Sequence, residues 1–327
     1  MKLYDVTIIG GGPIGLFTAF YCGMRELETK IIEYLPFLGG KVSYFYPEKT
    51  IRDIGGIPAI SGENLIRQLE SQARTFDPTI VLNQQVVGLV KLQDGTFQLT
   101  SHNGERHHTK AIILATGFGA LKSSRLDLKD EEKYEGRNLH YTVESLKHFE
   151  GKHVLISGGG NSALDWANEL LPIARQVTVV HRRNEFSGLE RYITTLRNST
   201  ATILTPYVIE KLHGEDARLT GVSVKNMETE QVQVIHVDDV LVNHGFSIDL
   251  GPIKKWGLEF EKGSIKVDEF MQTNIEGIFA AGDIASYQNK LHLIAGGFCE
   301  GPTAVNSVKA YIEPEKELKP IYSTTHF

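Results

Sequence analysis

A glycine-rich stretch near the N-terminus constrains the fold of this chain more than any other feature. The apolar run Val6–Ile9 leads directly into glycines spaced G-x-G-x-x-G over 10–15. Gly10 permits a tight turn out of a strand, Gly12 lets a phosphate approach the backbone, and Gly15 allows a helix to pack closely on the strand. The pattern therefore predicts a strand, a turn and a helix whose N-terminus binds a pyrophosphate.

An acidic residue follows at the distance that a dinucleotide fingerprint requires. Lys30–Glu33 is predicted to be a strand, and Glu33 lies 23 positions after Gly10. A carboxylate there accepts hydrogen bonds from the ribose hydroxyls of an adenosine and repels a 2′-phosphate. The alternative is a glycine-rich turn without a ligand, and the acid at this spacing argues against it. We expect FAD or NAD to bind through Gly10, Gly12, Pro13, Ile14, Gly15 and Glu33.

The same pattern occurs again in the middle of the chain. The run His153–Ser157 leads into G-x-G-x-x-A over 158–163, and the basic run His181–Arg183 begins 23 positions after Gly158. Guanidinium groups bind phosphate through paired hydrogen bonds and stay charged. The alternative for these arginines is a solvated surface pair. The second fingerprint predicts an NADP site made by Gly160, Asn161, Ser162, His181, Arg182 and Arg183.

Composition limits the remaining possibilities. A chain of 327 residues with 41% hydrophobic and 23% charged residues is typical of roughly two ordinary globular domains. The formal net charge of −6 argues against nucleic acid or an anionic membrane as a partner. No run approaches the ~18 apolar residues of a membrane span, and the N-terminus does not resemble a signal peptide. We expect a cytoplasmic protein.

The cysteines are few and far apart. Cys22 and Cys299 are the two cysteines of the sequence, and they form no C-x-x-C motif. This argues against a disulfide framework and against a dithiol redox centre in the chain. We also expect no metal site.

Four motifs in order resemble the flavoproteins with two dinucleotide-binding domains. Besides the two fingerprints, they are Ala115–Gly117 and the T-x5-F-A-x-G-D motif of Thr273–Asp283. The resemblance covers nearly the whole chain and implies an α/β fold of two three-layer, Rossmann-like domains. It implies that Asp283 contacts the flavin ribityl chain. The layout implied is an FAD-binding domain of residues 1–117 and 245–327, with an NADPH-binding domain of residues 118–244 inserted in it.

Within that group, the sequence is similar to the thioredoxin-reductase-like ferredoxin–NADP+ reductases. The inserted segment has no cysteine, and local matches occur at 10–16, 46–49, 243–246, 250–254 and 322–325. The resemblance implies a homodimer in which Tyr46 stacks on one face of the isoalloxazine ring and Tyr322, from the partner subunit, covers the other. It implies further FAD contacts at Lys41, Val86, Leu121 and Thr324.

The function implied by this resemblance is electron transfer. NADPH would pass a hydride to FAD without a side-chain acid or base, and single electrons would then leave to ferredoxin or flavodoxin. One alternative is an NADPH-dependent reductase of a disulfide or small molecule that lacks its own dithiol. A non-enzymatic flavin-binding regulator and a flavin monooxygenase are others; the second fingerprint argues against the former, and no further oxygenase motif supports the latter.

Overall fold

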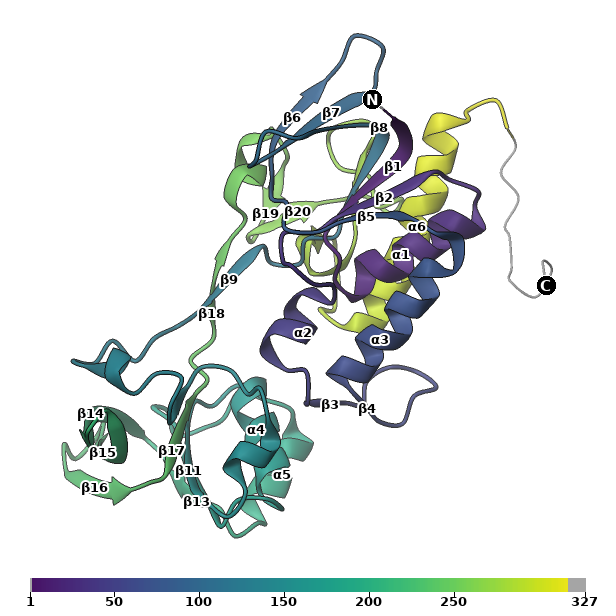
Figure 1. Cartoon of the computed structure of the whole chain (residues 1–327). Coiled ribbons are helices and arrows are strands. Elements are labelled where there is room, and N and C mark those ends of the chain that lie inside the picture. Colours follow the sequence, from purple (N-terminus) through teal and green to yellow (C-terminus); the bar gives the residue numbers. More distant parts are fainter. Residues whose placement is uncertain (1, 317–327) are drawn as a thin grey trace. The chain divides into compact units, whose positions relative to one another are not determined.

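The computed structural model describes residues 2–316, without the side chains of residues 120–122, 247 and 248. The chain divides into two compact units (Figure 1). The first unit combines the chain up to Tyr44 with Thr50–Ala120 and everything described from Asp249 onward. The second unit is Leu121–Ile248 together with Phe45–Lys49. We expected residues 45–49 in the first domain, but they pack with the second unit.

A largely parallel sheet forms the centre of the first unit. Its first strand, β1 (Leu3–Ile9), pairs in parallel with β2 and with β8, and its residues Val6 and Ile8 are fully buried. Parallel strands buried on both faces are expected to be continuous apolar runs, as this one is. The strand order is β5 (Thr79–Val81), β2 (Thr29–Ile32), β1, β8 (Arg106–Leu114), β7 (Phe97–Ser101) and β6 (Val86–Lys91), with β21 (Ile278–Ala280) also pairing with β8.

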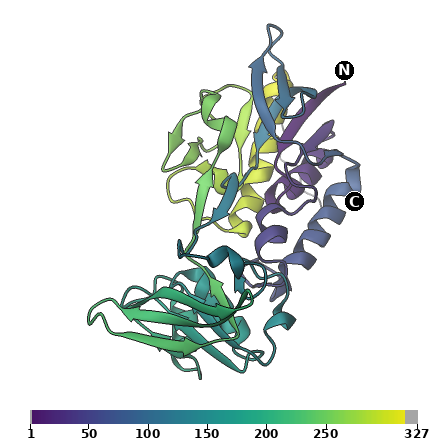
Figure 2. The same cartoon turned by 60° about the vertical axis from the view of Figure 1, so that its left-hand side comes forward.

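Helices α1 (Pro13–Met24), α3 (Gly62–Ala73) and α6 (Ile294–Ile312) lie side by side along this sheet (Figures 1 and 2). The α3 helix begins where the Ser61 side chain accepts a hydrogen bond from the amide of Asn64, an N-cap of the usual kind. Shorter elements complete the unit: α2 (Gly40–Phe45), β3 (Thr50–Ile51), β4 (Ile60–Ser61), β19 (Phe260–Glu261), β20 (Ser264–Lys266), β22 (Ala285–Ser286), η1 (Arg74–Phe76), η4 (Gly251–Lys255) and η5 (Gly282–Ile284).

The second unit has three layers, and the alternation of one strand shows why. Within β11 (His153–Ser157), Val154 and Ile156 pack in the cluster formed with α4, whereas Leu155 packs in the cluster formed with β14 and β15. Successive side chains of a strand point to opposite faces, so an apolar strand needs cover on both sides. The central parallel sheet has the order β10 (Leu139–His140), β17 (Asp239–Val242), β11, β12 (Gln176–Val180) and β13 (Thr202–Leu204).

The two outer layers differ in kind. Helices cover one face and a three-stranded antiparallel sheet covers the other (Figure 1). The helices are α4 (Asn161–Leu170) and α5 (Glu190–Arg197), and the antiparallel strands are β14 (Tyr207–Glu215), β15 (Arg218–Asn226) and β16 (Val232–His236). Two short 3-10 turns, η2 (Glu131–Lys133) and η3 (Leu146–Phe149), precede β11.

Apart from the short segment Phe45–Lys49, the chain enters and leaves the second unit through two adjacent segments. Strand β9 (Ala120–Ser123) leads into the second unit and β18 (Phe246–Asp249) leads out of it, and the two strands pair with each other. Among the helices of residues 2–316, none has the length and apolar character to cross a membrane.

Candidate functional site

The first fingerprint forms an open turn at the start of α1. Gly10 has φ +112°, and a Cβ there would lie 2.4 Å from the carbonyl oxygen of Ala115. A Cβ on Gly15 would lie 1.9 Å from the carbonyl oxygen of Gly10, whereas one on Gly12 would meet nothing within 4 Å. No side chain caps the helix, and its first turn holds no acid. Free amides and an unopposed helix dipole therefore face open space, which fits a pyrophosphate.

Glu33 closes this turn from the end of β2. Its Oε2 accepts a hydrogen bond of 2.6 Å from the amide of Gly11, and its Oε1 accepts one of 2.8 Å from the amide of Leu35. Burial raises the pKa of Glu33, and the amide hydrogen bonds oppose that rise. Each carboxylate oxygen has two lone pairs, so each can still accept a ribose hydroxyl. The geometry fits an adenosine ribose beside the pyrophosphate.

A second loop lies against the start of α1. Asp283 lies on η5, and the Gly282 that precedes it has φ +80° and packs on Ile14. The first turn of α6 approaches the same side chain, because a Cβ on Gly297 would lie 2.4 Å from Ile14 Cδ1. Two helix N-termini and the Asp283 turn therefore meet at one place in the first unit.

Buried groups fix the backbone beside Asp283. Glu300 is 4% exposed; its Oε2 accepts a 2.7 Å hydrogen bond from the amide of Gly282 and its Oε1 accepts one of 2.7 Å from the hydroxyl of Tyr287. Lys290 forms an ion pair with Glu300 and donates to the carbonyl oxygen of Gly282 at 3.2 Å. Burial and the neighbouring Glu300 raise the pKa of Tyr287 to about 12. We did not anticipate this clamp of Glu300, Lys290 and Tyr287, since its members are polar and charged residues scattered over one loop and one helix.

A row of side chains continues from Asp283 through the first unit. The Nδ1 of His292 lies 3.4 Å from an Asp283 oxygen, the His292 ring lies 5.4 Å from that of Phe118, and the Lys41 ammonium lies 5.3 Å from the Phe118 centroid. Two expected FAD contacts, Lys41 and Asp283, are therefore joined by two aromatic rings that the sequence did not single out.

The remaining expected FAD contacts do not form one cluster in the described part of the chain. Val86 is buried at the start of β6, two residues after Gln84, whose amide donates to the Glu33 carbonyl at 3.0 Å. Tyr46 is grouped with the second unit and packs against its helix-side core cluster. The side chain of Leu121, and Tyr322 and Thr324 altogether, lie outside the described part of the chain.

The second fingerprint repeats the first in the second unit. Gly158 has φ +153°, and a Cβ there would lie 2.5 Å from the carbonyl oxygen of Asn243. Gly160 precedes α4, which again has no side-chain cap and no acid in its first turn. Three expected NADP contacts, Gly160, Asn161 and Ser162, line a cavity of about 140 Å³ between the α4 N-terminus and the end of β17. The Asn161 Oδ1 already accepts a hydrogen bond of 2.9 Å from the amide of Leu189.

The basic run lies where β12 ends. Arg182 and Arg183 are exposed, and the His181 ring stacks on Phe186 at 5.5 Å while its Nε2 lies 3.1 Å from the Glu185 carbonyl oxygen. Partial burial, followed by the charges of Arg183 and Arg182, lowers the pKa of His181. Two exposed guanidinium groups beside a neutral imidazole suit a phosphate that arrives from solvent.

The cysteines give no redox pair. Cys22 is buried in α1 and Cys299 is exposed in α6, and both thiols are free. Burial raises the pKa of the Cys22 thiol to about 12, so it stays protonated and unreactive.

One further cluster was not expected from the sequence. His140, His148 and Asp239 bring together ligand atoms within 4.8 Å of one another. We expected no metal site because no two of these residues form a local ligand motif: the histidines lie on different elements, and Asp239 is almost a hundred positions away.

These two sites define the class: an α/β protein with two dinucleotide-binding domains, as the sequence predicted. The chain belongs to the pyridine nucleotide-disulphide oxidoreductase family, whose pattern it matches over residues 4–306. It is 58% identical over 325 residues to ferredoxin–NADP reductase 1 of Bacillus velezensis, covering 99% of this chain and 97% of that protein. It is 49% identical over 326 residues to ferredoxin–NADP reductase 2 of Bacillus subtilis, covering 100% and 98%.

A solved structure supports the same fold. Thioredoxin reductase of Lactococcus lactis in its FR conformation matches with a TM-score of 0.82 at 26% identity, over 95% of this chain and 99% of that one. The family resemblance and the fold class inferred from the sequence are therefore confirmed.

Proposed function

We propose that this protein is a flavoprotein oxidoreductase that takes hydride from NADPH and delivers single electrons to ferredoxin. One observation carries the proposal: the chain has two equivalent strand–turn–helix sites, one closed by the carboxylate of Glu33 and the other by Arg182 and Arg183. The first suits a nucleotide with a free ribose and the second suits one with a 2′-phosphate. One nucleotide as resident cofactor and the other as reductant is the simplest use of such a pair.

The residues of the first unit would hold the resident FAD. The open turn at Gly12 and the N-terminus of α1 bind the pyrophosphate, and Glu33 accepts the adenosine ribose hydroxyls. Asp283, which follows the Gly282 backbone held by Glu300, would contact the ribityl chain. FAD, when bound, supplies the chemistry that accepts a hydride and releases electrons one at a time.

The second unit would bind and orient NADPH. The N-terminus of α4 meets the pyrophosphate at Gly160–Ser162, and Arg182 and Arg183 bind the 2′-phosphate. No side chain needs to donate or accept a proton in hydride transfer, so we assign no acid or base.

The acceptor follows from the relatives and from the cysteines. The relatives at 58% and 49% identity bear the name ferredoxin–NADP reductase. Since the sequence has no C-x-x-C, electrons have no dithiol to pass through on their way out. Flavodoxin, which also takes single electrons, is proposed as an alternative acceptor.

Several finer assignments belong to the same proposal. The FAD-binding domain is residues 1–117 and 245–327, except that Phe45–Lys49 is grouped with the second unit, and the NADPH-binding domain is residues 118–244. Two copies of the chain form a cytoplasmic dimer. The further FAD contacts are Lys41, Val86 and Leu121, with Tyr46 on one flavin face and Tyr322 and Thr324 of the partner subunit on the other.

One experiment tests the nucleotide assignment. Replacing Arg182 and Arg183 together by alanine should raise KM for NADPH by roughly a hundredfold, because two charged hydrogen-bonding groups are lost, and leave KM for NADH nearly unchanged. Arg197→Ala, an exposed arginine on α5 of the same unit, is the matched control and should alter neither constant. Equal effects of the double variant on both nucleotides would contradict the 2′-phosphate assignment.

A second experiment tests the acceptor. NADPH oxidation is measured with ferredoxin, flavodoxin, thioredoxin and a small disulfide in parallel. Ferredoxin or flavodoxin should support turnover at least tenfold faster than either disulfide acceptor. Faster turnover with thioredoxin would instead favour the disulfide-reductase alternative. The likeness to a thioredoxin reductase structure is the reason to test it.

A further inference from the structure

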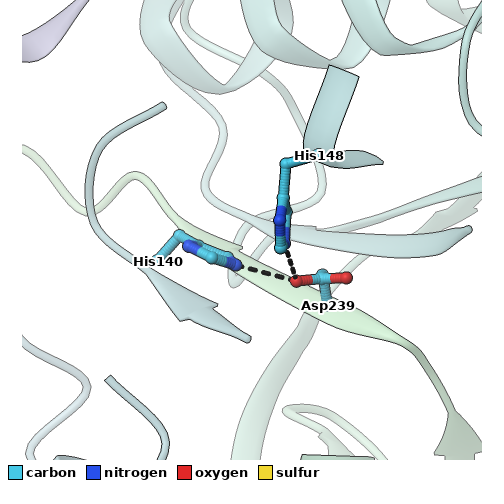
Figure 3. Close-up of side chains that lie close together, drawn as sticks. All are labelled: His140, His148 and Asp239. Atoms are coloured by element: carbon cyan, nitrogen blue, oxygen red, sulfur yellow. Dashed lines mark hydrogen bonds and ion pairs between the residues drawn. The ribbon is translucent and has the colours of Figure 1, made fainter. Parts of the chain in front are cut away.

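Three side chains from separate elements of the second unit converge on one point (Figure 3). His140 ends β10, His148 lies on η3 and Asp239 begins β17. The Nε2 atoms of His140 and His148 lie 2.8 Å and 2.7 Å from the same oxygen, Oδ1, of Asp239. Two imidazole nitrogens and a carboxylate oxygen therefore lie close enough together for one ion to bind all three in place of their mutual hydrogen bonds.

The fold holds these groups in place before any ligand binds. The pairing of β10 with β17 sets His140 opposite Leu241, two residues beyond Asp239. The buried ring of Phe149 packs edge-on against both imidazoles, with centroids 5.3 Å from His140 and 4.9 Å from His148. Ligands whose rotamers are fixed by packing lose little entropy when they bind an ion.

Asp239 is a buried carboxylate that requires cationic or hydrogen-bonding partners. Its side chain is 1% exposed. Burial alone would raise its pKa, but hydrogen bonds from His140, His148 and Lys152 hold the pKa below the ordinary value. A buried carboxylate that remains ionised is either paired with a cation or bound to a metal.

We propose that His140, His148 and Asp239 form a binding site for a divalent transition-metal ion, of which zinc is the best match. Two imidazoles and one carboxylate are ligands that zinc accepts, with a water molecule or another group in its fourth position. A cavity of about 550 Å³ borders the cluster, and His148, Lys152 and Asp239 line it together with residues of β15. Hard cations such as Mg²⁺ prefer oxygen ligands and fit this set poorly.

Lys152 is the competitor that sets the affinity. Its Nζ lies 2.9 Å from Asp239 Oδ2 and 3.0 Å from His148 Nε2, so its positive charge already balances the charge of the carboxylate. A metal must displace this ammonium, and the long side chain, 29% exposed, can turn toward solvent to allow it. Removing the ammonium charge should therefore strengthen metal binding, which an adventitious surface site would not show.

The experiment measures zinc binding to the FAD-loaded protein after treatment with a chelator. Equilibrium dialysis should give one zinc ion per chain. His148→Ala should weaken that binding by roughly a hundredfold or more, since even the loss of an outer hydrogen-bond partner costs ten- to a hundredfold. Lys152→Met should tighten it by roughly tenfold. The control His236→Ala removes an exposed histidine of the same unit and should change nothing.

The control measurements separate binding from damage to the fold. Thermal unfolding without metal gives each variant its own baseline, because His148→Ala also removes a hydrogen bond to the buried Asp239. Added zinc should then raise Tm for the unaltered protein and for Lys152→Met but not for His148→Ala. The proposal is overturned by the absence of stoichiometric zinc on the unaltered protein, by equal affinity in His148→Ala, by no gain in Lys152→Met, or by Mg²⁺ binding as tightly as zinc.

Discussion

Alanine at two glycines of the first fingerprint should affect two different quantities. Gly15→Ala should lower the free energy of unfolding, and Gly12→Ala should lower the affinity for FAD. In Gly15→Ala, the new Cβ would lie 1.9 Å from the carbonyl oxygen of Gly10, about 1.5 Å closer than an ordinary contact. The Gly10 oxygen is part of the main chain, and the new Cβ is bonded directly to the main chain, so neither can rotate away. The turn or α1 must therefore move. Overpacking of this kind costs about 1–3 kcal/mol or more, and the better helix propensity of alanine recovers only about 1 kcal/mol. We expect a net loss of about 2 kcal/mol.

Gly12→Ala is the matched control. Its Cβ meets nothing within 4 Å, and Gly12 has φ −73°, which alanine adopts without strain. The change at this N-cap position should cost about 1 kcal/mol or less. The methyl group would, however, stand where the pyrophosphate approaches the backbone. The affinity for FAD should therefore fall at least tenfold, which corresponds to about 1.4 kcal/mol.

The two effects are measured on deflavinated protein. Urea unfolding gives the free energy of unfolding without FAD, and fluorescence titration gives the affinity for FAD. Gly15→Ala should lower the first quantity, and Gly12→Ala should lower chiefly the second. Unaltered unfolding of Gly15→Ala would refute the steric reasoning, and undiminished FAD binding by Gly12→Ala would refute the position given to the pyrophosphate.

Three further predictions concern ionisable groups. Glu300→Gln leaves the ammonium of Lys290, which is 6% exposed, buried without its counter-charge, so it should lower the free energy of unfolding by about 3 kcal/mol. In the same urea experiment, the double variant with Lys290→Met should recover most of that loss. Burial, and next the charge of Lys30, lowers the pKa of His107, so the unfolded chain binds this proton more readily than the folded protein does. The contribution of neutral His107 to the free energy of unfolding is therefore complete above about pH 6.5 and is lost as the pH falls. His107→Gln should flatten the acid limb of a stability–pH profile, and an unchanged slope would contradict this. A bound 2′-phosphate should raise the lowered pKa of His181, so NADPH binding should take up protons below neutral pH and NADH binding should not. Calorimetry in two buffers would show this uptake, and His181→Gln should abolish it.

The nucleotide-binding turns could be read from the sequence because their determinants are local. Each fingerprint lies within a single strand–turn–helix, and the ribose-side residue follows one strand later. Gly10 and Gly158 have φ values that favour glycine in any surroundings, and their close approaches to Ala115 and Asn243 add a second reason that depends on the fold. Fold class and family were predictable for the same reason.

Turns and helix limits that depend on packing cannot be read from the local sequence. Gly221 lies inside β15, where a Cβ would come within 2.8 Å of a carbonyl oxygen of β16. The turn before it falls at Asp216 and Ala217, both with positive φ, which alanine does not favour. The last helix begins at Ile294 and contains Gly297 and Gly301, which are small residues packed on α1.

Groups that depend on distant contacts carried no signal. Tyr46 precedes a lysine that pairs with Asp165 on α4, and this association with the second unit has no counterpart in the local sequence. The His140, His148 and Asp239 cluster requires the pairing of β10 with β17, whose residues lie about a hundred positions apart. Neither could be derived without the topology.

The two adjacent crossings at β9 and β18 determine the order in which the chain becomes able to fold during synthesis. When residue 248 leaves the ribosome, every residue of the second unit has been made. The first unit then still lacks β21, which pairs with β8, and α6, which packs on α1. Domains fold as units once their residues are present. The inserted unit can therefore fold first. The edge of β8 that pairs with β21, and the face of α1 that packs on α6, remain uncovered until β21 and α6 have been made.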